Sequence, residues 1–180
     1  MAEIRQVLLS GFGGQGVVLA GVLLGEAGVI DGRYVSGSNS YGAQARGSGC
    51  KSEIVFSDGP IDFPHLITAD ILVALSQGAY DLYCREVKES SGIILYDQGQ
   101  VTPQEGLRVK QIGIPATDWA LKQLKNKQVA NIILVGALIE TTKLVSLEAM
   151  EKAMKTHVSQ RYQALNLEAL KIGLELGRAA

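Results

Sequence analysis

A glycine-rich segment near the N-terminus is the part of this chain best suited to chemistry. Residues 11–16 read Gly-Phe-Gly-Gly-Gln-Gly, between an apolar run at 7–9 and a long apolar stretch from 17 onward. The glycine spacing satisfies G-x-G-x-x-G, a pattern that allows a tight turn and close approach of a ligand. Backbone N–H groups at the start of the following helix would attract an anion. The candidate binding residues of this segment are Gly11, Gly13, Gly14, Gln15 and Gly16. The alternative is a turn that only packs.

The residues around this turn disfavour ATP or GTP hydrolysis and weaken the case for a dinucleotide-binding site. A P-loop requires Lys and then Ser or Thr after its last glycine, whereas this chain has Val17-Val18. Dinucleotide binding requires an acid about 20 residues further on, at the end of the second strand, to hold the ribose. Residues 36–38 contain no acid, and Glu26 and Asp31 precede that position. An NAD-type oxidoreductase therefore stays as an alternative. Asp31 would be the required acid if the second strand lies a few residues from its predicted position.

A second polar segment runs from Ser36 to Cys50 without helical or strand periodicity. Long ordered loops in compact domains are usually functional, and this one is rich in Gly, Ser and amide side chains. Arg46 suits a phosphate or carboxylate, or a salt bridge across a subunit interface. Tyr41 suits stacking on an adenine or packing at an interface. The candidate binding residues of this segment are Ser40, Tyr41, Arg46 and Gly47.

Composition and charge exclude several classes of protein. The chain has 180 residues, is 47% hydrophobic and carries a net charge of −1, with no basic run, so nothing points to nucleic acid or to an anionic membrane surface. Its longest apolar stretch, 17–24, is far shorter than a membrane span, and we expect a cytoplasmic protein. Cys50 and Cys84 lie far apart, as do His65 and His157, so we assign no metal site and no catalytic residue to this chain.

Apolar periodicity predicts strands alternating with helices, followed by a helical C-terminal third. The predicted strands are 4–10, a short one at 34–35, 51–57, 71–75, 93–96 and 107–112. The predicted helices are 17–30, 77–88, 116–125, 129–142, 147–155 and 165–176. Without repeats or linkers, this pattern indicates an α/β fold: a single Rossmann-like domain over 1–180, with a mostly parallel sheet flanked by helices.

Several segments in order resemble one protein family over essentially the whole chain. They are the 11–16 segment, Ser-Tyr-Gly-Ala-Gln-Ala-Arg-Gly at 40–47 with Ser-Glu-Ile-Val at 52–55, and Leu-Ser-Gln-Gly-Ala-Tyr-Asp at 75–81. Two helical segments, 131–138 and 166–173, complete the pattern. The chain resembles the gamma subunit of 2-oxoacid:ferredoxin (acceptor) oxidoreductases, most of all the 2-oxoglutarate type, in the pyruvate/ketoisovalerate oxidoreductase gamma-domain family. It departs from the family at three positions. The family often has Pro and Glu where this chain has Ala43 and Gln44, and it often has Glu where this chain has Gly78.

The resemblance implies one subunit of an enzyme that decarboxylates a 2-oxoacid on thiamine diphosphate and passes electrons through iron–sulfur clusters to ferredoxin. The acyl group goes to coenzyme A. It implies alpha and beta subunits that bind thiamine diphosphate and Mg, a ferredoxin-like delta subunit, and a gamma chain that contributes to coenzyme A binding at a shared site. The residues agree, because this chain has neither a thiamine diphosphate motif nor a cysteine set for a cluster. We expect the isolated chain, a monomer or a homodimer, to be inactive.

Two expectations complete this interpretation. Successive loops meet at the carboxyl edge of a parallel sheet, so we expect the glycine amides of 13–16 and the 40–47 loop to share one cleft. The residues leave the choice among 2-oxoglutarate, pyruvate and branched-chain 2-oxoacids open, and family analogy favours 2-oxoglutarate. The alternatives to a coenzyme A-binding subunit are a free-standing NAD-type oxidoreductase and a purely structural assembly subunit.

Overall fold

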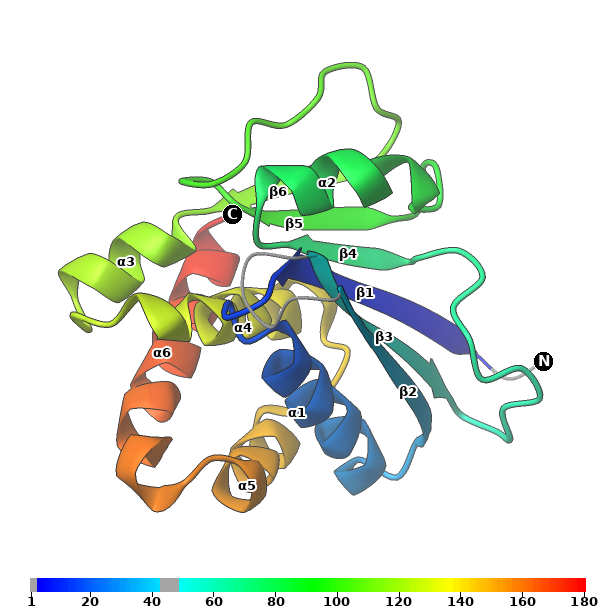
Figure 1. The fold of residues 1–180 in the computed structure, drawn as a ribbon. Coiled ribbons are helices and arrows are strands. Elements are labelled where there is room, and N and C mark those ends of the chain that lie inside the picture. Colours follow the sequence, from blue (N-terminus) through cyan, green and yellow to red (C-terminus); the bar gives the residue numbers. More distant parts are fainter. Residues whose placement is uncertain (1–2, 43–48) are drawn as a thin grey trace.

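Strands and helices alternate over most of the chain (Figure 1). The structure, a computed structural model, describes residues 3–42 and 49–180. Its strands are β1 (Ile4–Phe12), β2 (Tyr34–Tyr41), β3 (Gly49–Ser57), β4 (Ile71–Ala74), β5 (Ile93–Asp97) and β6 (Lys110–Ile114). Its helices are α1 (Val17–Ile30), α2 (Gln77–Tyr83), α3 (Ala116–Lys122), α4 (Ala130–Thr142), α5 (Leu147–His157) and α6 (Gln160–Ala179), with short 3-10 helices η1 (Cys84–Glu86) and η2 (Lys127–Val129).

The described strands form one six-stranded sheet in the order β2-β3-β1-β4-β5-β6. The pairs β1–β4, β4–β5 and β5–β6 are parallel, whereas β3 runs antiparallel to both of its neighbours, β1 and β2. The predicted α/β fold with a mostly parallel sheet is therefore confirmed. The sheet differs from a fully parallel Rossmann sheet at the hairpin β2–β3. The strand after α1 is β2, and the antiparallel β3 separates it from β1.

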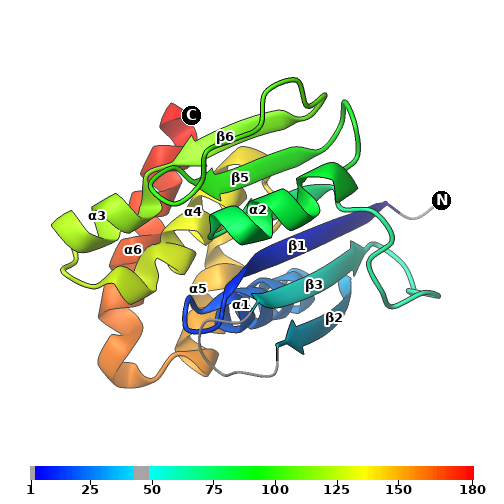
Figure 2. The same cartoon turned by 45° about the horizontal axis from the view of Figure 1, so that its top comes forward.

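Helices cover the two faces of the sheet unequally. Figure 2 shows α2 in front of the sheet and α1, α4 and α5 behind it. The larger core joins Val7 and Leu9 of β1 to the helices behind the sheet, and the smaller core joins Leu8 to Tyr80 of α2. Alternate residues of β1 thus enter opposite cores, as the pleat of a strand requires. Both cores meet at β1, which leads directly into the glycine segment.

The helices α4 and α6 approach each other closely enough to exclude a side chain between them. A Cβ atom at Gly136 would lie 2.5 Å from the carbonyl oxygen of Leu170, and one at Gly173 would overlap the carbonyl oxygen of Ile133. Glycine costs helix propensity at such positions but permits this backbone contact. The contact fixes the position of α6, whose first turns face the N-terminus of α1.

The largest error of the sequence prediction lies in the segment after Val35. Residues 36–41 were expected to belong to an aperiodic loop, but they continue β2 and pair with β3 from Tyr34–Ser57 to Tyr41–Cys50. Residues 36–40 are serine, glycine and asparagine, and Tyr41 is the one aromatic among 36–41, so no hydrophobic alternation marks the strand. The strand exists because β3 supplies its hydrogen-bonding partner, which a local pattern does not reveal. The part of the predicted loop at 43–48 lies outside the described residues.

Most other predicted elements are confirmed with shifted ends. α1 has the predicted bounds, and α4 begins one residue later than predicted. The helix predicted over 77–88 ends at Tyr83 and continues as η1, and the strand predicted over 107–112 lies at Lys110–Ile114. The last helix is longer than predicted and starts at Gln160. Among the residues that the structure describes, no helix combines the length and the apolar character needed to cross a bilayer.

Candidate functional site

The glycine segment forms the connection between β1 and α1. β1 continues to Phe12, so Gly11 is the last glycine with strand pairing and the turn itself spans Gly13–Gly16. Gly14 has φ 98° and Gly16, the N-cap of α1, has φ 73°. Both values fall in the left-handed region that glycine adopts without a steric penalty. The turn therefore needs glycine at these two positions, of which Gly16 is the last glycine of the motif and Gly14 is one of its variable positions.

The side chain of Gln15 holds this turn in place. Its Oε1 accepts a hydrogen bond from the backbone N–H of Phe12 at 2.6 Å, and its Nε2 donates to the carbonyl oxygen of Leu75 at 2.9 Å. A Cβ atom at Gly11 would lie 2.5 Å from the same Oε1, so Gly11 leaves room for this arrangement. Gln15 was predicted as a binding residue, and the structure shows that both polar ends of its amide are engaged within the fold.

The helix α1 starts without a side-chain cap. The backbone N–H groups of Gly13, Gly14 and Gly16 find no acceptor among the described residues, while Ala20 donates to the carbonyl oxygen of Gly16 at 3.0 Å. Uncapped N–H groups at a helix start carry partial positive charge and favour a negative group nearby. The electrostatics that the sequence predicted for this turn are thus available in the fold.

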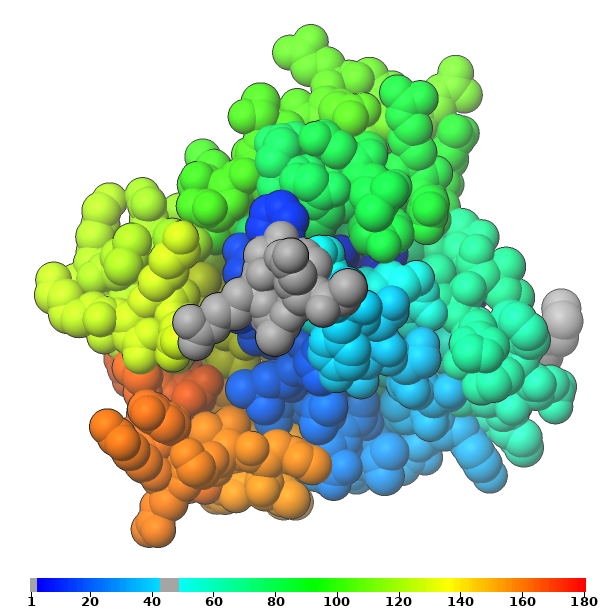
Figure 3. Space-filling view, viewed as in Figure 1, coloured from blue at the N-terminus to red at the C-terminus, as the bar shows by residue number. Residues whose placement is uncertain are grey.

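In the described part of the chain, two pockets border this turn, one on each side. The first, which we call the hairpin pocket, has a volume of about 450 Å³ and is lined by the ends of β1, β2 and β3 and by α2. Gly11, Ser40 and Tyr41, three of the predicted binding residues, line it together. Figure 3 shows the green surface of α2 above a blue surface from the N-terminal part of the chain, with a cyan surface below and to the right. Tyr41 is 65% exposed there.

Lys51 is a hairpin-pocket residue that the sequence analysis did not nominate. It pairs with Ser10 of β1 and Ser40 of β2 in the sheet register, and its ammonium group lies 2.5 Å from Glu53 Oε1 and 5.8 Å from the ring centre of Tyr83. The hydrogen bond to Glu53 raises the pKa of Lys51, although burial opposes the shift. The residue therefore stays positively charged at neutral pH. Only the register of the hairpin reveals that it faces the same pocket as Ser40.

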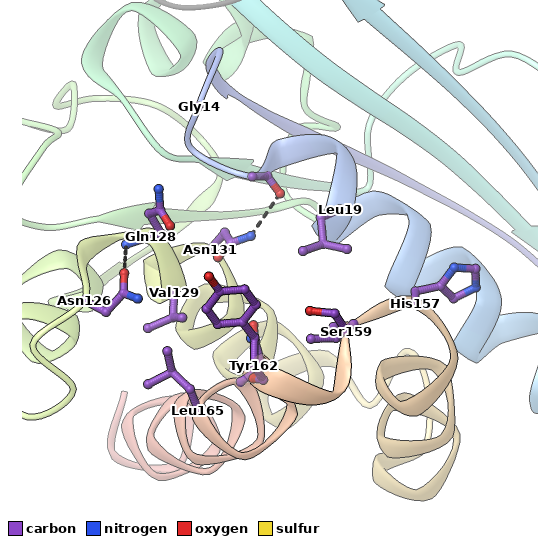
Figure 4. A pocket seen from close by; sticks show the side chains of 13 residues that line it. Gly14, Leu19, Asn126, Gln128, Val129, Asn131, His157, Ser159, Tyr162 and Leu165 are labelled. Carbon is purple, nitrogen blue, oxygen red and sulfur yellow. Dashed lines mark hydrogen bonds between the residues drawn. The ribbon is translucent and has the colours of Figure 1, made fainter.

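The second pocket, which we call the amide pocket, lies between the N-terminus of α1 and the helices α4 and α6 (Figure 4). Its volume is about 320 Å³, and Gly14 and Gly16 form one edge of it. Asn131 of α4 donates a hydrogen bond to the carbonyl oxygen of Gly16 at 2.9 Å, which joins the pocket to the turn. The opposite side includes Tyr162 of α6.

The predicted single cleft is therefore divided, as far as the structure describes it. Gly11, Ser40 and Tyr41 line the hairpin pocket, whereas Gly14 and Gly16 line the amide pocket. Gly13 and Gln15 lie in the turn between the two groups. Arg46 and Gly47 lie outside the described residues, so the expectation that they join the glycine amides stays a prediction.

Asp31, the acid considered for an NAD-type site, lies far from the glycine turn. Asp31 is the C-cap of α1, at the opposite end of this 14-residue helix from the glycine turn. Its carboxylate accepts hydrogen bonds from the backbone N–H and the hydroxyl of Ser146, both at 2.6 Å. Asp31 therefore ties α1 to the start of α5, and its position gives the NAD alternative no support.

Comparison with known proteins decides the family. The family model described as pyruvate ferredoxin/flavodoxin oxidoreductase matches residues 6–176. The chain belongs to this family. It is 44% identical over 177 residues to the 2-oxoglutarate synthase subunit KorC of Methanocaldococcus jannaschii, in an alignment that covers 97% of this chain and 94% of that protein. The resemblance noted from the sequence motifs is thereby confirmed.

Solved structures agree with this family assignment. The gamma subunit of a keto/oxoacid ferredoxin oxidoreductase from Geobacter sulfurreducens has a TM-score of 0.89 and 37% identity, with 99% of each chain covered. The 2-oxoglutarate:ferredoxin oxidoreductase from Magnetococcus marinus also has a TM-score of 0.89, but at 22% identity and over 32% of its longer chain. This second likeness concerns the fold, which recurs as part of a larger polypeptide.

The described residues of this family member do not fit the metal centres associated with such oxidoreductases. Within 3–42 and 49–180, no three His, Cys, Asp or Glu side chains lie close enough together to hold a metal ion. Cys50 and Cys84 are free thiols, and burial raises the pKa of each of them. Burial therefore favours the protonated thiol at both cysteines.

Proposed function

We propose that this chain is the gamma subunit of a 2-oxoglutarate:ferredoxin oxidoreductase. Such a complex oxidatively decarboxylates 2-oxoglutarate, transfers the acyl group to coenzyme A and passes the electrons to ferredoxin. The observation that carries the proposal is the end-to-end similarity to KorC, at 44% identity over 97% of the chain. The substrate is assigned from that relative, a subunit of a 2-oxoglutarate synthase.

The other cofactors belong to partner subunits in this proposal. Thiamine diphosphate and Mg would lie between alpha and beta subunits, and the iron–sulfur clusters would lie in partner chains that include a ferredoxin-like delta subunit. The described residues offer neither a metal cluster nor a set of thiolates for them. The gamma chain then acts by assembly and by binding coenzyme A, and the isolated chain has no activity.

Coenzyme A binding is supported by the chemistry of the turn and of the hairpin pocket. The molecule carries several phosphate groups on a long flexible arm, so its site needs donors and a positive charge. The uncapped N–H groups of Gly14 and Gly16 and the ammonium group of Lys51 meet these needs on either side of one turn. We place a phosphate at the turn and the arm along the hairpin pocket, with Ser40 and Tyr41 beside it.

The decisive experiment replaces Lys51 in the reconstituted complex. Lys51→Ala should raise the KM for coenzyme A about tenfold, because a charge-assisted hydrogen bond contributes roughly 1.5–3 kcal/mol, and it should leave the KM for 2-oxoglutarate unchanged. Lys171→Ala on α6 is the matched control, since that lysine is exposed and lies outside the hairpin pocket. Arg46→Ala tests the predicted loop residue in the same assay.

The variant also frees Glu53 from its partner, and a second variant separates the two effects. Lys51→Ala combined with Glu53→Gln removes the unpaired carboxylate and should keep the raised KM if Lys51 contacts the ligand. An unchanged KM in an intact complex would assign Lys51, and the hairpin pocket with it, to structure alone. Saturable binding of NAD by the full chain would favour the oxidoreductase alternative, and loss of assembly with unchanged coenzyme A kinetics would favour a structural subunit.

A further inference from the structure

The described sheet ends on one side at a long strand whose outer edge is open. β2 pairs with β3 from Tyr34–Ser57 to Tyr41–Cys50 without a bulge, and Figure 1 and Figure 2 show it at the margin of the sheet. Its eight residues include no proline and no charged side chain. Lysine, proline or a bulge usually protects an edge strand from pairing with another chain. The opposite edge strand, β6, is short and begins with the exposed Lys110. Only the edge at β2 lacks such protection in the described sheet.

The ladder between β2 and β3 identifies the backbone groups at this open edge. The N–H of Gly42 donates to the carbonyl oxygen of Gly49 at 3.0 Å, so these two residues form a hydrogen-bonded pair in the register of the hairpin. Such pairs alternate along an antiparallel ladder, so the even-numbered residues of β2 bond to β3. The N–H and C=O groups that point to the open edge, without a hydrogen-bond partner among the described residues, are those of residues 35, 37, 39 and 41.

Helix α1 presents an apolar stripe next to this edge. The stripe consists of four residues at helical spacing on one face of the helix: Val18, Val22, Gly25 and Val29. Val22 is 37% exposed and Val29 is 54% exposed. A Cβ atom at Gly25 would lie 3.7 Å from Val35, so the stripe borders β2. Exposed apolar residues in a row on a helix indicate a surface that another element covers.

The charge of α1 lies on a different side of the helix. Glu26 is its one charged residue, and the carboxylate lies 3.7 Å from the ring of His157 on α5. Neither the stripe nor β2 therefore contributes a charge of its own. The open strand edge and the stripe form one uncharged surface along the same side of the domain.

An uncharged surface of this kind suits a second copy of the same chain. In a two-fold dimer each patch meets an identical patch, so a charged strand would repel itself. A two-fold axis perpendicular to the sheet makes the two β2 strands antiparallel and keeps both α1 helices on one side of the joined sheet. The register centred on Ser38 gives every open residue a partner, because it pairs 35 with 41 and 37 with 39 of the second copy.

We infer that the chain forms a two-fold dimer through β2, in which two six-stranded sheets join into one and the two α1 stripes pack against each other beside the seam. Val35 then lies opposite Tyr41 of the second copy, a pair of β-branched and aromatic side chains that stabilises antiparallel strands. Val22 lies near the axis, because its neighbour Gly21 borders Ser52, which pairs with Asn39 in the sheet. The inference goes beyond the proposed function, which leaves the number of gamma chains in the complex open.

The first test measures the mass of the full chain in solution. Sedimentation equilibrium should show a dimer of the 19.2-kDa chain. Asn39→Pro removes an N–H that points to the open edge and leaves the bonds to β3 in place, so it should raise the dimer dissociation constant about thirtyfold through two lost hydrogen bonds per dimer. Val22→Glu sets like charges against each other near the axis and should raise the constant at least about tenfold. Leu121→Glu is the matched control, because Leu121 is 47% exposed but lies on α3.

Cysteine substitution tests the register. Ser38→Cys places two thiols directly opposite each other in a non-hydrogen-bonded pair, where the Cα atoms are about 4.5 Å apart and within disulfide range. Asn39→Cys is the matched control, because residue 39 is the more exposed of the two but would lie two residues out of register with its counterpart, beyond the reach of about 7 Å. Mild oxidation should link Ser38→Cys at least about tenfold faster than Asn39→Cys. The unsubstituted chain, whose two cysteines are buried, gives the background.

A chain that stays monomeric at concentrations on the order of 100 μM would overturn the inference, as would a dimer that neither Asn39→Pro nor Val22→Glu weakens. If circular dichroism shows that Asn39→Pro does not fold, Val22→Glu and the Ser38→Cys link decide. A monomeric chain whose β2 amides become protected only in the reconstituted complex, without a Ser38→Cys link, would assign the edge to a strand of another subunit. The kinetic test at Lys51 is independent of all these outcomes, so the proposed function stands or fails separately.

Discussion

The two pockets beside the glycine turn differ in how they are built. The hairpin pocket is formed by strand ends and by α2, and its charge comes from Lys51, a long side chain held by Glu53. The amide pocket is formed where α1, α4 and α6 meet, and its polar groups are short amides on packed helices. In the hairpin pocket the charged group can change its position because it ends a long side chain. In the amide pocket the packed helices fix the directions of the hydrogen-bonding groups. One backbone turn can therefore serve both charge attraction and recognition of shape.

The contact between α4 and α6 gives the largest expected effect on this comparison. Gly173→Ala would place a methyl group against the carbonyl oxygen of Ile133 and force α6 outward, which should lower the free energy of unfolding by about 3 kcal/mol. Gly25→Ala in α1 is the matched control, since its Cβ would lie 3.7 Å from Val35 and alanine gains about 0.5–1 kcal/mol of helix propensity. Urea denaturation of both variants measures the difference. Equal stabilities would refute the backbone contact.

Substitutions in the glycine turn should have an intermediate effect on stability, and the effect should differ between Gly14 and Gly16. Alanine at Gly14 or Gly16 must adopt a left-handed conformation, which costs roughly 1–2 kcal/mol at either position. At Gly16 the new Cβ would also overlap the Nδ2 of Asn131, whereas at Gly14 it would meet no atom of the described residues. Gly16→Ala should therefore destabilise the chain by about 1 kcal/mol more than Gly14→Ala. Thermal unfolding of the two variants side by side provides the measurement, and an inverted order would contradict the Asn131 contact.

The smallest expected effect is a change in the alkylation rate of Cys50, which reports on the hairpin pocket, with Cys84 as the comparison. Burial raises the pKa of Cys50 and of Cys84, so the reactive thiolate is scarce at pH 7 and alkylation should accelerate about tenfold per pH unit below the pKa. Cys50 lines the hairpin pocket and Cys84 does not. Desulfo-coenzyme A should therefore slow iodoacetamide labelling of Cys50 in the complex and leave Cys84 unaffected. Mass spectrometry of the labelled peptides reports both rates, and protection of Cys84 alone would argue against the proposed arm position.

Local sequence patterns predicted the elements that carry their own signal. α1 follows a glycine motif and is apolar except for Glu26, and its bounds were predicted correctly. β4 and β5 are short apolar runs that only a buried parallel sheet accommodates. By contrast, residues 36–41 of β2 have no aliphatic side chain and one aromatic, the exposed Tyr41, and they depend on β3 for their hydrogen bonds. Local patterns therefore failed to predict the part of the sheet that depends on a strand further along the chain.

The candidate site shows the same division. The glycine motif identified the turn, and the loop composition identified Ser40 and Tyr41, which share a pocket with Gly11. Lys51 looked like an ordinary polar position of an alternating strand, and only pairing with Ser40 brings it to the pocket. Asn131 looked like a polar residue inside an apolar helix, and only the approach of α4 to α1 gives it a role. Both residues act through contacts that span large separations along the chain.

The position of β3 has a consequence for the order in which the sheet opens. Within one chain, β2 is an edge strand whose sheet neighbour is β3, so its amide protons lose their ladder whenever β3 unfolds or separates from β2. In a single copy, protection against hydrogen exchange in β2 can then never exceed that of β3, while β4 and β5, which do not pair with β3, retain theirs. A ligand that bridges the end of β2 and the start of β3 to the start of α1 would hold both strands against the rest of the domain.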